Sequence, residues 1–240
     1  MNNILVIDSA VSGDSSVSKA LVRDAVAALA EQAPASIVHR DLGRDPVPHL
    51  TEETLAGVRG TPGTEAELAT RALSDELVAE LRAADVVVIG APMYNFSIAT
   101  GLRSWFDHVL RAGETFRYTE AGPQGLLGGK HVIVVESRGG LYSEGPAQAV
   151  DFQEPYLRHL LGFIGLRDVT FVRAERIGFG RGTAVPSGGR DSTTGLRSAT
   201  RPCGDKGKTW IPPGKKSPHS RPATAPRAGT CSASARDSPP

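Results

Sequence analysis

The chain has 240 residues, of which 40% are hydrophobic and 22% charged, so it can bury a substantial core. Its formal net charge of +1 conceals a division, because residues 1–180 carry 16 Lys and Arg against 23 Asp and Glu, whereas residues 181–240 carry 11 against 3. Both cysteines, Cys203 and Cys231, lie in the basic part, which excludes a disulfide framework and a cysteine-ligated zinc site in residues 1–180.

From the start of the chain and its apolar runs we expect neither a signal peptide nor a membrane span. No basic, apolar leader opens the sequence, and no apolar run approaches the roughly 18 residues of a membrane span. We therefore expect a cytoplasmic protein, which the lack of cysteine in residues 1–180 also favours.

Strand and helix patterns alternate from the start. Residues 4–7 are apolar and predict a buried strand, and after a Ser/Gly loop the apolar residues within 21–29 recur with the period of a helix. Residues 36–39 predict a second, weaker strand, and the Pro- and Gly-rich residues 41–63 predict a long excursion. A helix lined by leucines follows at residues 73–81.

The same alternation continues through the next part of the chain. Residues 85–90 predict the strongest strand, whose β-branched run is typical of a central parallel strand covered on both faces. A helix is predicted at residues 97–110 and a fourth strand at 131–135. A further helix at 156–164 and a fifth strand at 169–172 complete the pattern.

Strands that alternate with helices predict an α/β fold with a parallel sheet between two helical layers. Five strands suit a flavodoxin-like three-layer sandwich with strand order 2-1-3-4-5, and we assign residues 1–178 to this domain. Ligands of such sheets bind at the carboxyl ends of strands 1, 3 and 4, so the loops that follow these strands are the candidate site.

The pattern ends near residue 180. Residues 181–240 contain no Phe or Tyr and are dominated by Gly, Pro, Ser, Thr, Ala and Arg. Such a segment cannot bury enough apolar surface to offset the ~1–2 kcal/mol per residue that ordering costs. We therefore expect residues 179–240 to form a disordered Pro/Gly/Ser/Arg-rich tail.

The loop after the first strand is rich in hydroxyl groups. It includes Ser9 and leads to a helix that starts at Ser16, Val17 and Ser18. Free amides and the helix dipole favour an anion at such a place, although a serine there can equally be a helix cap. The loop lacks the Gly-Lys-Ser/Thr of a nucleoside-triphosphate site, so it suits a monophosphate such as that of FMN.

The loop after the third strand carries two aromatic residues, a thioether and an amide, in Met93, Tyr94, Asn95 and Phe96. Aromatic and thioether groups can pack against a flat ring. On residue types alone, the alternative is a hydrophobic lid over the core. The position at the sheet edge favours a flavin.

The loop after the fourth strand carries paired glycines in the run Ser137, Arg138, Gly139 and Gly140. Glycines let the backbone approach a ligand closely and free its amides to donate. Aimed at the polar edge of a flavin, such donors would stabilise the negative charge of the reduced ring. An ordinary glycine turn is the alternative.

Taken together and in order, these loops resemble those of the bacterial FMN-dependent NADH-azoreductases, which also reduce quinones. The Met-Tyr-Asn-Phe and Ser-Arg-Gly-Gly runs are specific to that family, and about three quarters of the chain is matched. Besides the first loop, the resemblance rests on residues 73–77, 91–96, 111–113, 115–120, 137–140, 155–157 and 161–165.

The resemblance implies a cofactor, a reaction and an assembly. The cofactor is bound FMN, NADH is the co-substrate, and turnover is ping-pong: the nicotinamide leaves before a quinone or an azo compound, whose azo bond is cleaved, takes the electrons. The protein is implied to be a homodimer with FMN at the subunit interface. The FMN phosphate is implied to lie at the first loop and the ring at the other two, with backbone contacts at most from Ala10 and Val17.

Three further residues are implied on the substrate side. Tyr118 and Phe163 occupy segments that line the substrate in the family, although both can also be structural aromatics. Arg59 lies in the excursion and can meet the phosphates of a dinucleotide, or be a solvated surface charge. We expect no metal, because the six histidines show no metal-ligand spacing. We also expect no protein acid–base residue, because hydride moves between cofactor rings and the proton can come from water.

Other classes of function remain open at this point. A non-catalytic flavodoxin-like electron carrier is the main alternative, although such carriers are usually strongly acidic. A receiver-like module needs an acidic cluster after the first strand, where only Asp8 is present. The scattered basic residues of the tail, with Trp210 as their one aromatic neighbour, disfavour nucleic acid as a partner.

The tail is a departure from the family, whose members close the fold with one more amphipathic helix. GC-rich DNA that is read out of frame yields Arg, Pro, Gly, Ala and Ser. We therefore hypothesise a reading-frame shift near residue 180, which predicts that another frame encodes an Ala-rich amphipathic helix.

Overall fold

A computed structural model describes residues 2–179 and 185–187 of the chain. All of them belong to the first of two units, Met1–Gly204, and the second unit, Asp205–Pro240, lies outside the described residues. The main elements of the first unit, in chain order, are β1 (Asn2–Asp8), α1 (Val17–Gln32), β2 (Ala35–Asp41), α2 (Leu55–Arg59), α3 (Glu65–Ala83), β3 (Val86–Pro92), α4 (Thr100–Val109), β4 (Phe116–Thr119), β5 (Gly122–Gly125), β6 (His131–Ser137), α5 (Glu154–Phe163), β7 (Asp168–Glu175) and β8 (Val185–Ser187). Short 3-10 turns η1 (Gly13–Ser15), η2 (Pro146–Val150) and η3 (Ile177–Phe179) lie in the loops.

The five predicted strands form a parallel sheet in the order β2-β1-β3-β6-β7, which confirms the predicted 2-1-3-4-5 order. A sixth strand, β8, pairs antiparallel with β7. β8 and Phe179, at the end of η3, lie within residues 179–240, the segment predicted to be disordered. For residues 180–184 and 188–240 that expectation lies outside the described residues.

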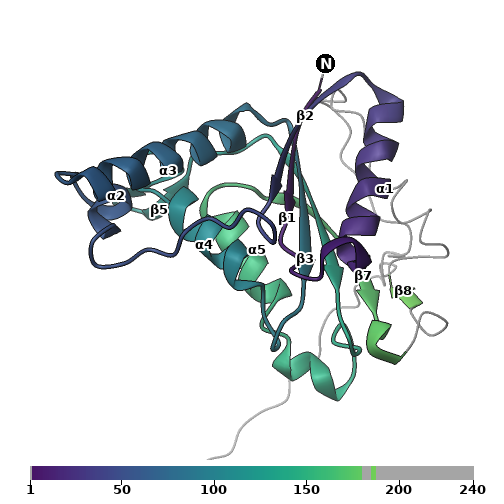
Figure 1. The fold of residues 1–240 in the computed structure, drawn as a ribbon. Coiled ribbons are helices and arrows are strands. Elements are labelled where there is room, and N and C mark those ends of the chain that lie inside the picture. The colour runs from purple at the N-terminus through teal and green to yellow at the C-terminus, as the bar shows by residue number, and fades with distance from the viewer. Residues whose placement is uncertain (1, 180–184, 188–240) are drawn as a thin grey trace, which may run out of the picture. The chain divides into compact units, whose positions relative to one another are not determined.

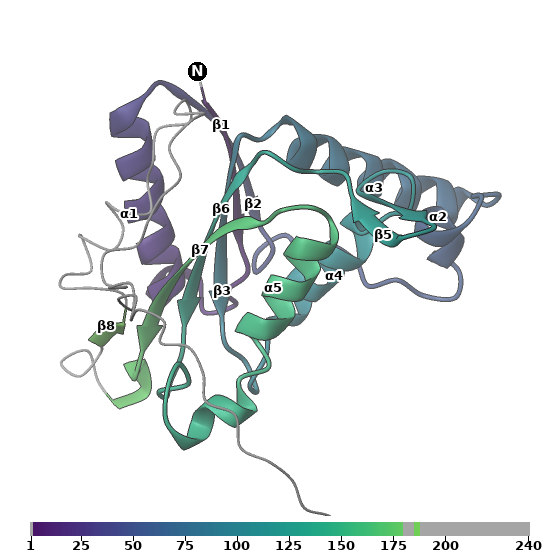
Figure 2. The same ribbon diagram turned by 180° about the vertical axis from the view of Figure 1, so that it is seen from behind.

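Helices cover both faces of the sheet (Figures 1 and 2). On one face α1 packs Val22, Ala25 and Leu29 against alternate residues of β1, β3 and β6. On the other face α3, α4 and α5 pack around Leu77, Trp105 and a larger set of apolar residues. The strands of the sheet centre are buried along almost their whole length, as expected for parallel strands between two helical layers.

Two elements were not predicted from the sequence. The excursion at residues 41–63 contains the short helix α2, which packs on α3. Residues 116–125 form the hairpin β4–β5, whose Gly125 lies so close to the backbone of Gly165 that a Cβ atom would be 2.1 Å from its nitrogen. Both elements are held by contacts distant in sequence, which local periodicity does not contain.

Among the residues that the structure describes, no helix combines the length and the apolar character needed to cross a membrane.

Candidate functional site

The structure brings the three candidate loops together at the carboxyl edge of the sheet. The Met93 amide donates to the Ser137 carbonyl at 2.8 Å, which joins the second loop to the third. The Val11 amide donates to the Tyr94 hydroxyl at 3.2 Å, which joins the first loop to the second. The parallel register of β1, β3 and β6 places all three loops side by side, because carboxyl ends of parallel strands share one edge.

The first loop ends in a helix start that is built to hold an anion. Ser16 caps α1, and its side chain accepts from the Lys19 amide at 3.2 Å. The hydroxyls of Ser16 and Ser18 are buried 3.1 Å apart, so one of their two protons stays available to a ligand. The amides of Val17 and Ser18 have no acceptor in the described residues, as is usual in the first turn of a helix.

The charged side chains of Asp8 and Lys19, on either side of this loop, are paired with other residues. The Lys19 ammonium makes a 2.6 Å ion pair with Asp41, and the buried Asp8 carboxylate pairs with His39 at 2.8 Å. Burial raises the pKa of Asp8, which the His39 contact only partly opposes. Ser9 donates from its hydroxyl to the Gly90 carbonyl at 2.7 Å and so ties β1 to β3. The remaining donors of the loop are uncharged.

The second loop is a tight turn with an unusual backbone. Tyr94 and Ser97 exchange backbone hydrogen bonds of 2.9 and 3.1 Å, and Asn95 and Phe96 both have positive φ, 48° and 71°. This is the geometry of a type I′ turn, which favours Asn followed by Gly. A phenylalanine in the left-handed region costs of order 1–3 kcal/mol, and such strain clusters at functional sites. The Phe96 side chain remains 48% exposed.

The third loop presents free amides. The carbonyls of Arg138, Gly139 and Gly140 accept hydrogen bonds from the amides of Ile177, Gly178 and Arg176. Within the described part of the chain, the amides of Gly139 and Gly140 have no acceptor. A Cβ atom on Gly139 would meet nothing within 4 Å, so the space in front of this residue is open. The loop therefore offers uncharged donors to a ligand that approaches its backbone.

Arg138 takes a different place from its two glycine neighbours. Its side chain is fully buried beneath the loop and contacts Glu136 at 2.6 Å, Asp151 at 3.1 Å and Glu175 at 3.3 Å. Its Nε donates to Gln153 at 3.1 Å, and Gln153 in turn donates to the Ala91 carbonyl at 2.8 Å. The guanidinium thus links the ends of β3, β6 and β7, and it does not reach the open edge of the loop.

Sequence reasoning missed the acidic partners of Arg138. Burial raises the pKa of Glu136 to about 8, against the opposing effect of Arg138. A signal was present, because Glu136 stands at the end of the apolar run of β6, where a charge has to be paired. The partners Asp151, Gln153 and Glu175 carried no such signal, since they lie in other elements.

The predicted substrate-side residues lie away from the three loops within one chain. Arg59, at the end of α2, donates to the carbonyls of Leu110 and Asp107 near the end of α4. Tyr118 is 74% exposed on β4. Its ring and that of Phe163 both contact the ring of Phe116, with centroid distances of 5.5 and 4.6 Å.

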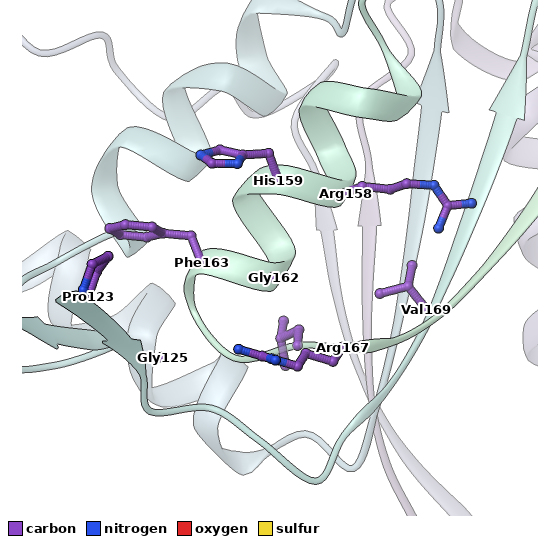
Figure 3. Close-up of a pocket in the computed structure, with 9 residues that line it drawn as sticks. Pro123, Gly125, Arg158, His159, Gly162, Phe163, Arg167 and Val169 are labelled. Atoms are coloured by element: carbon purple, nitrogen blue, oxygen red, sulfur yellow. The ribbon is translucent and has the colours of Figure 1, made fainter. Parts of the chain in front are cut away.

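Phe163 also lines a cavity of about 470 Å³ between the end of α5 and the hairpin. Figure 3 shows Phe163 and His159 projecting from α5 on the side of Pro123, with Arg167 nearby. The start of α5 lies beneath the third loop, because Gln153, the residue before this helix, accepts from Arg138 and donates to Ala91. Because α5 rises ~1.5 Å per residue, its two ends are about 14 Å apart, and the cavity is separate from the loops.

The three loops can hold a flat ligand that carries a phosphate group. The start of α1 fits the phosphate, the Tyr94–Ser97 turn offers an aromatic wall, and the glycine amides fit a polar ring edge. The backbone of Gly139 is open to a ligand, because a Cβ atom there would meet nothing within 4 Å. Residues 2–179 and 185–187 contain no group of three or more His, Cys, Asp or Glu that could bind a metal ion.

Comparisons with known proteins agree with the observed fold. The model of a family described as having a flavodoxin-like fold matches residues 2–186. An FMN-dependent NADH:quinone oxidoreductase of Hyphomonas neptunium is 66% identical over 181 residues, which cover 75% of this chain and 87% of the relative. An azoreductase structure from Bacillus anthracis str. Sterne has a TM-score of 0.72 and 30% identity, covering 83% of this chain and 97% of the other. An FMN-dependent NADH-azoreductase from B. anthracis str. Ames Ancestor, solved with FMN, has a TM-score of 0.68 and 26% identity, with coverage of 83% and 94%.

Proposed function

We propose that this chain, which belongs to the family of FMN-dependent NADH:quinone oxidoreductases, uses bound FMN to pass electrons from NADH to quinones and azo compounds. The observation that carries the proposal is the meeting of three loops at one sheet edge. One loop ends in a helix start with free amides, one is a strained aromatic turn, and one offers the free amides of Gly139 and Gly140.

Each loop takes one part of the cofactor. Ser16, Val17 and Ser18 hold the phosphate with uncharged donors, mainly the backbone amides at the start of α1. Ser9 positions this loop, because its hydroxyl and its amide both donate to the Gly90 carbonyl. Uncharged donors suffice there because the helix dipole favours an anion.

The other two loops hold the ring. The wall of the ring is formed by Met93, Tyr94, Asn95 and Phe96. Its polar edge meets Ser137, Gly139 and Gly140, and the buried Arg138 supports this loop from beneath through its pair with Glu136. When bound, FMN supplies hydride acceptance and electron transfer.

The protein's part in turnover is positioning and electrostatics. No acid–base side chain is required, since a proton for a quinone or an azo nitrogen can come from water. Amide donors fixed before the reaction stabilise negative charge as it develops, at no cost in reorganisation. One open face for both NADH and the acceptor leads to ping-pong turnover, in which each occupies the site in turn.

The placement of Arg59, Tyr118 and Phe163 supports a homodimer with a shared site. In one chain these residues lie far from the cofactor loops, and Tyr118 is largely exposed. A two-fold axis can place the hairpin β4–β5 of one subunit over the three loops of the other. Each contact in such an interface occurs twice, so both subunits receive the same cover. This arrangement assigns the three residues to the substrate side of the partner's FMN. NADH as electron donor suits a cytoplasmic enzyme.

The experiment starts from the purified full chain. Titration with FMN should produce a protein-bound flavin spectrum, and NADH with a quinone should then turn over without a second protein. Bound flavin with no turnover would instead indicate the electron carrier. A stably folded protein that ignores FMN would overturn the proposal.

A glycine substitution tests the site itself. Gly139→Ala adds a Cβ atom that meets no protein atom within 4 Å, so folding should be unaffected while the ring is displaced and FMN affinity falls at least about tenfold. Gly63→Ala is the matched control, because Gly63 is exposed in the segment before α3, away from the three loops, and its Cβ would meet only the Glu67 carboxylate, at 3.8 Å. Equal FMN affinity in both variants would remove Gly139 from the site.

A further inference from the structure

We propose that Glu175 is a positioning residue, which sets the direction of the Gly139 and Gly140 amides without touching the cofactor. This inference rests on the proposed function in one respect, namely that the ligand of these amides is FMN. We call residues 137–140 the glycine loop and residues 175–178 the clamp.

The backbone of the clamp holds the carbonyl side of the glycine loop. Hydrogen bonds run from Arg176 to Gly140 at 2.9 Å, from Gly178 to Gly139 at 3.1 Å and from Ile177 to Arg138 at 3.2 Å. Three neighbouring carbonyls are thus satisfied by three neighbouring amides. The clamp thus bonds the carbonyls of the loop and leaves the amides of Gly139 and Gly140 without an acceptor among the described residues. These two donors can therefore bind a ligand.

To make these bonds, the clamp adopts a left-handed backbone conformation at one residue and a close backbone approach at another. Arg176 has a positive φ of 60°, which a residue with a Cβ atom adopts only where its surroundings enforce it. A Cβ on Gly178 would lie 3.1 Å from the Gly139 carbonyl oxygen, closer than most such contacts. The approach of the two segments is therefore specified by the structure around them.

The Glu175 carboxylate enforces this geometry from inside the protein. It is almost completely buried, and its Oε1 accepts from the amides of Tyr142 at 2.8 Å and Ser143 at 2.9 Å. The same oxygen lies 3.3 Å from the Arg138 guanidinium, and the Ser143 hydroxyl donates to Oε2. One carboxylate thus holds both the start and the exit of the glycine loop with charge-assisted bonds.

The position of the clamp in the chain adds to its importance here. The composition departs from that of a folded domain from about residue 180, directly after Gly178. The three clamp amides that bond the glycine loop lie before that departure, whereas Glu175 also pairs with Val185 of β8, which lies after it.

Glu175→Gln in the full chain tests the proposal, because it removes the charge and keeps the shape. Two readouts are expected to change. Amide hydrogen exchange at Tyr142, Ser143 and residues 176–178 of the FMN-free protein should accelerate roughly five- to tenfold, since charge-assisted bonds become neutral ones. The dissociation constant of FMN, measured well below the melting temperature, should rise by a similar factor.

Glu80→Gln is the matched control, because Glu80 also pairs with an arginine, Arg40, at 2.6 Å but on α3, away from the loops. It should lower the melting temperature and leave both readouts unchanged. Should Glu175→Gln fail to fold, Ser143→Ala removes only the hydroxyl bond and should shift both readouts less, in the same direction.

The outcomes separate this inference from the proposed function. Unchanged exchange and unchanged FMN affinity in a destabilised Glu175→Gln protein would reduce Glu175 to a structural residue and overturn the inference. If the unsubstituted protein binds no FMN, the proposed function fails, and the exchange rates alone still decide whether Glu175 holds the loop.

Discussion

Glu136 illustrates how a single residue responds to burial. It lies at the end of β6 with no exposed surface, next to the guanidiniums of Arg138 at 2.6 Å and Arg173 at 3.9 Å. Glu154, on α5, adds a like charge that disfavours its ionisation. Its Oε1 has no hydrogen-bond partner in the part of the chain that the structure describes. Burial is the largest cause and raises its pKa to about 8.

This gives a prediction for stability against pH. A folded-state pKa above the ordinary value of 4.5 means that the stabilising contribution is complete below that value and is lost as pH rises through about 8. Glu136→Gln keeps a neutral side chain at every pH, so its free energy of unfolding should fall less between pH 5 and 9 than that of the unsubstituted protein. Urea unfolding across this range measures the difference, and parallel curves would contradict the raised pKa.

Arg138 is expected to contribute to folding rather than to catalysis. Arg138→Met leaves the buried carboxylates of Glu136, Asp151 and Glu175 without their cation and should cost about 3–5 kcal/mol of unfolding free energy. Arg158→Met is the control, because the Arg158 guanidinium is half-exposed and its partner Glu154 keeps Arg173, so the loss should be at most ~1 kcal/mol. Urea denaturation of both variants decides; similar losses would refute the distinction.

At the scale of elements, we expect a substitution in the Tyr94–Ser97 turn to change FMN affinity without lowering the stability of the fold. Phe96 sits at a positive φ that asparagine tolerates better, and its half-exposed ring buries little surface. Phe96→Asn should therefore leave the unfolding free energy unchanged or raise it by about 0.5–1 kcal/mol, while FMN affinity falls. Thermal unfolding and FMN titration give the two values. A fall in both would mean that the ring serves packing instead.

The predicted and observed elements differ where contacts are distant in sequence. All five parallel strands and the main helices followed from local periodicity, because each buries a regular face. The hairpin β4–β5 did not, since Gly122–Gly125 is a poor strand former that pairs only because its partner and the backbone of Gly165 lie against it. The helix α2 is likewise too short to show a period.

At the scale of the whole molecule, the homodimer stays a prediction. Light scattering during size-exclusion chromatography should give the mass of two chains. Tyr118→Glu puts a charge into the proposed interface and should shift the mass toward one chain and slow quinone reduction, while the fold remains, because the side chain is largely exposed. Gln32→Glu, exposed at the end of α1 on the other face of the sheet, adds the same charge away from the hairpin and controls for a change of surface charge alone. A monomer that reduces quinones at full rate would contradict the shared site.

The reading-frame hypothesis for the tail also stays a prediction, as does the domain boundary at residues 178 and 179. If the hypothesis holds, the helix that the resemblance implies after the fifth strand is not encoded, and without its cover on one sheet face the loss can be several kcal/mol at ~25 cal/mol per Å² of buried apolar surface. That is comparable to the ~5–15 kcal/mol by which domains are stable. Translation of the other two frames after residue 180 tests the hypothesis, and the absence of an amphipathic helix from both would refute it.

The sequence by itself determined the order of strands and helices and the three loops at the sheet edge, because hydrophobic period and short glycine or aromatic runs are local properties. Only the tertiary structure decided which donors are free, that Arg138 lies beneath its loop, and that Phe163 is at the far end of α5. Burial and ion pairing depend on residues that are distant along the chain, as Glu136, Asp151 and Glu175 are around one guanidinium. No local pattern carries that information.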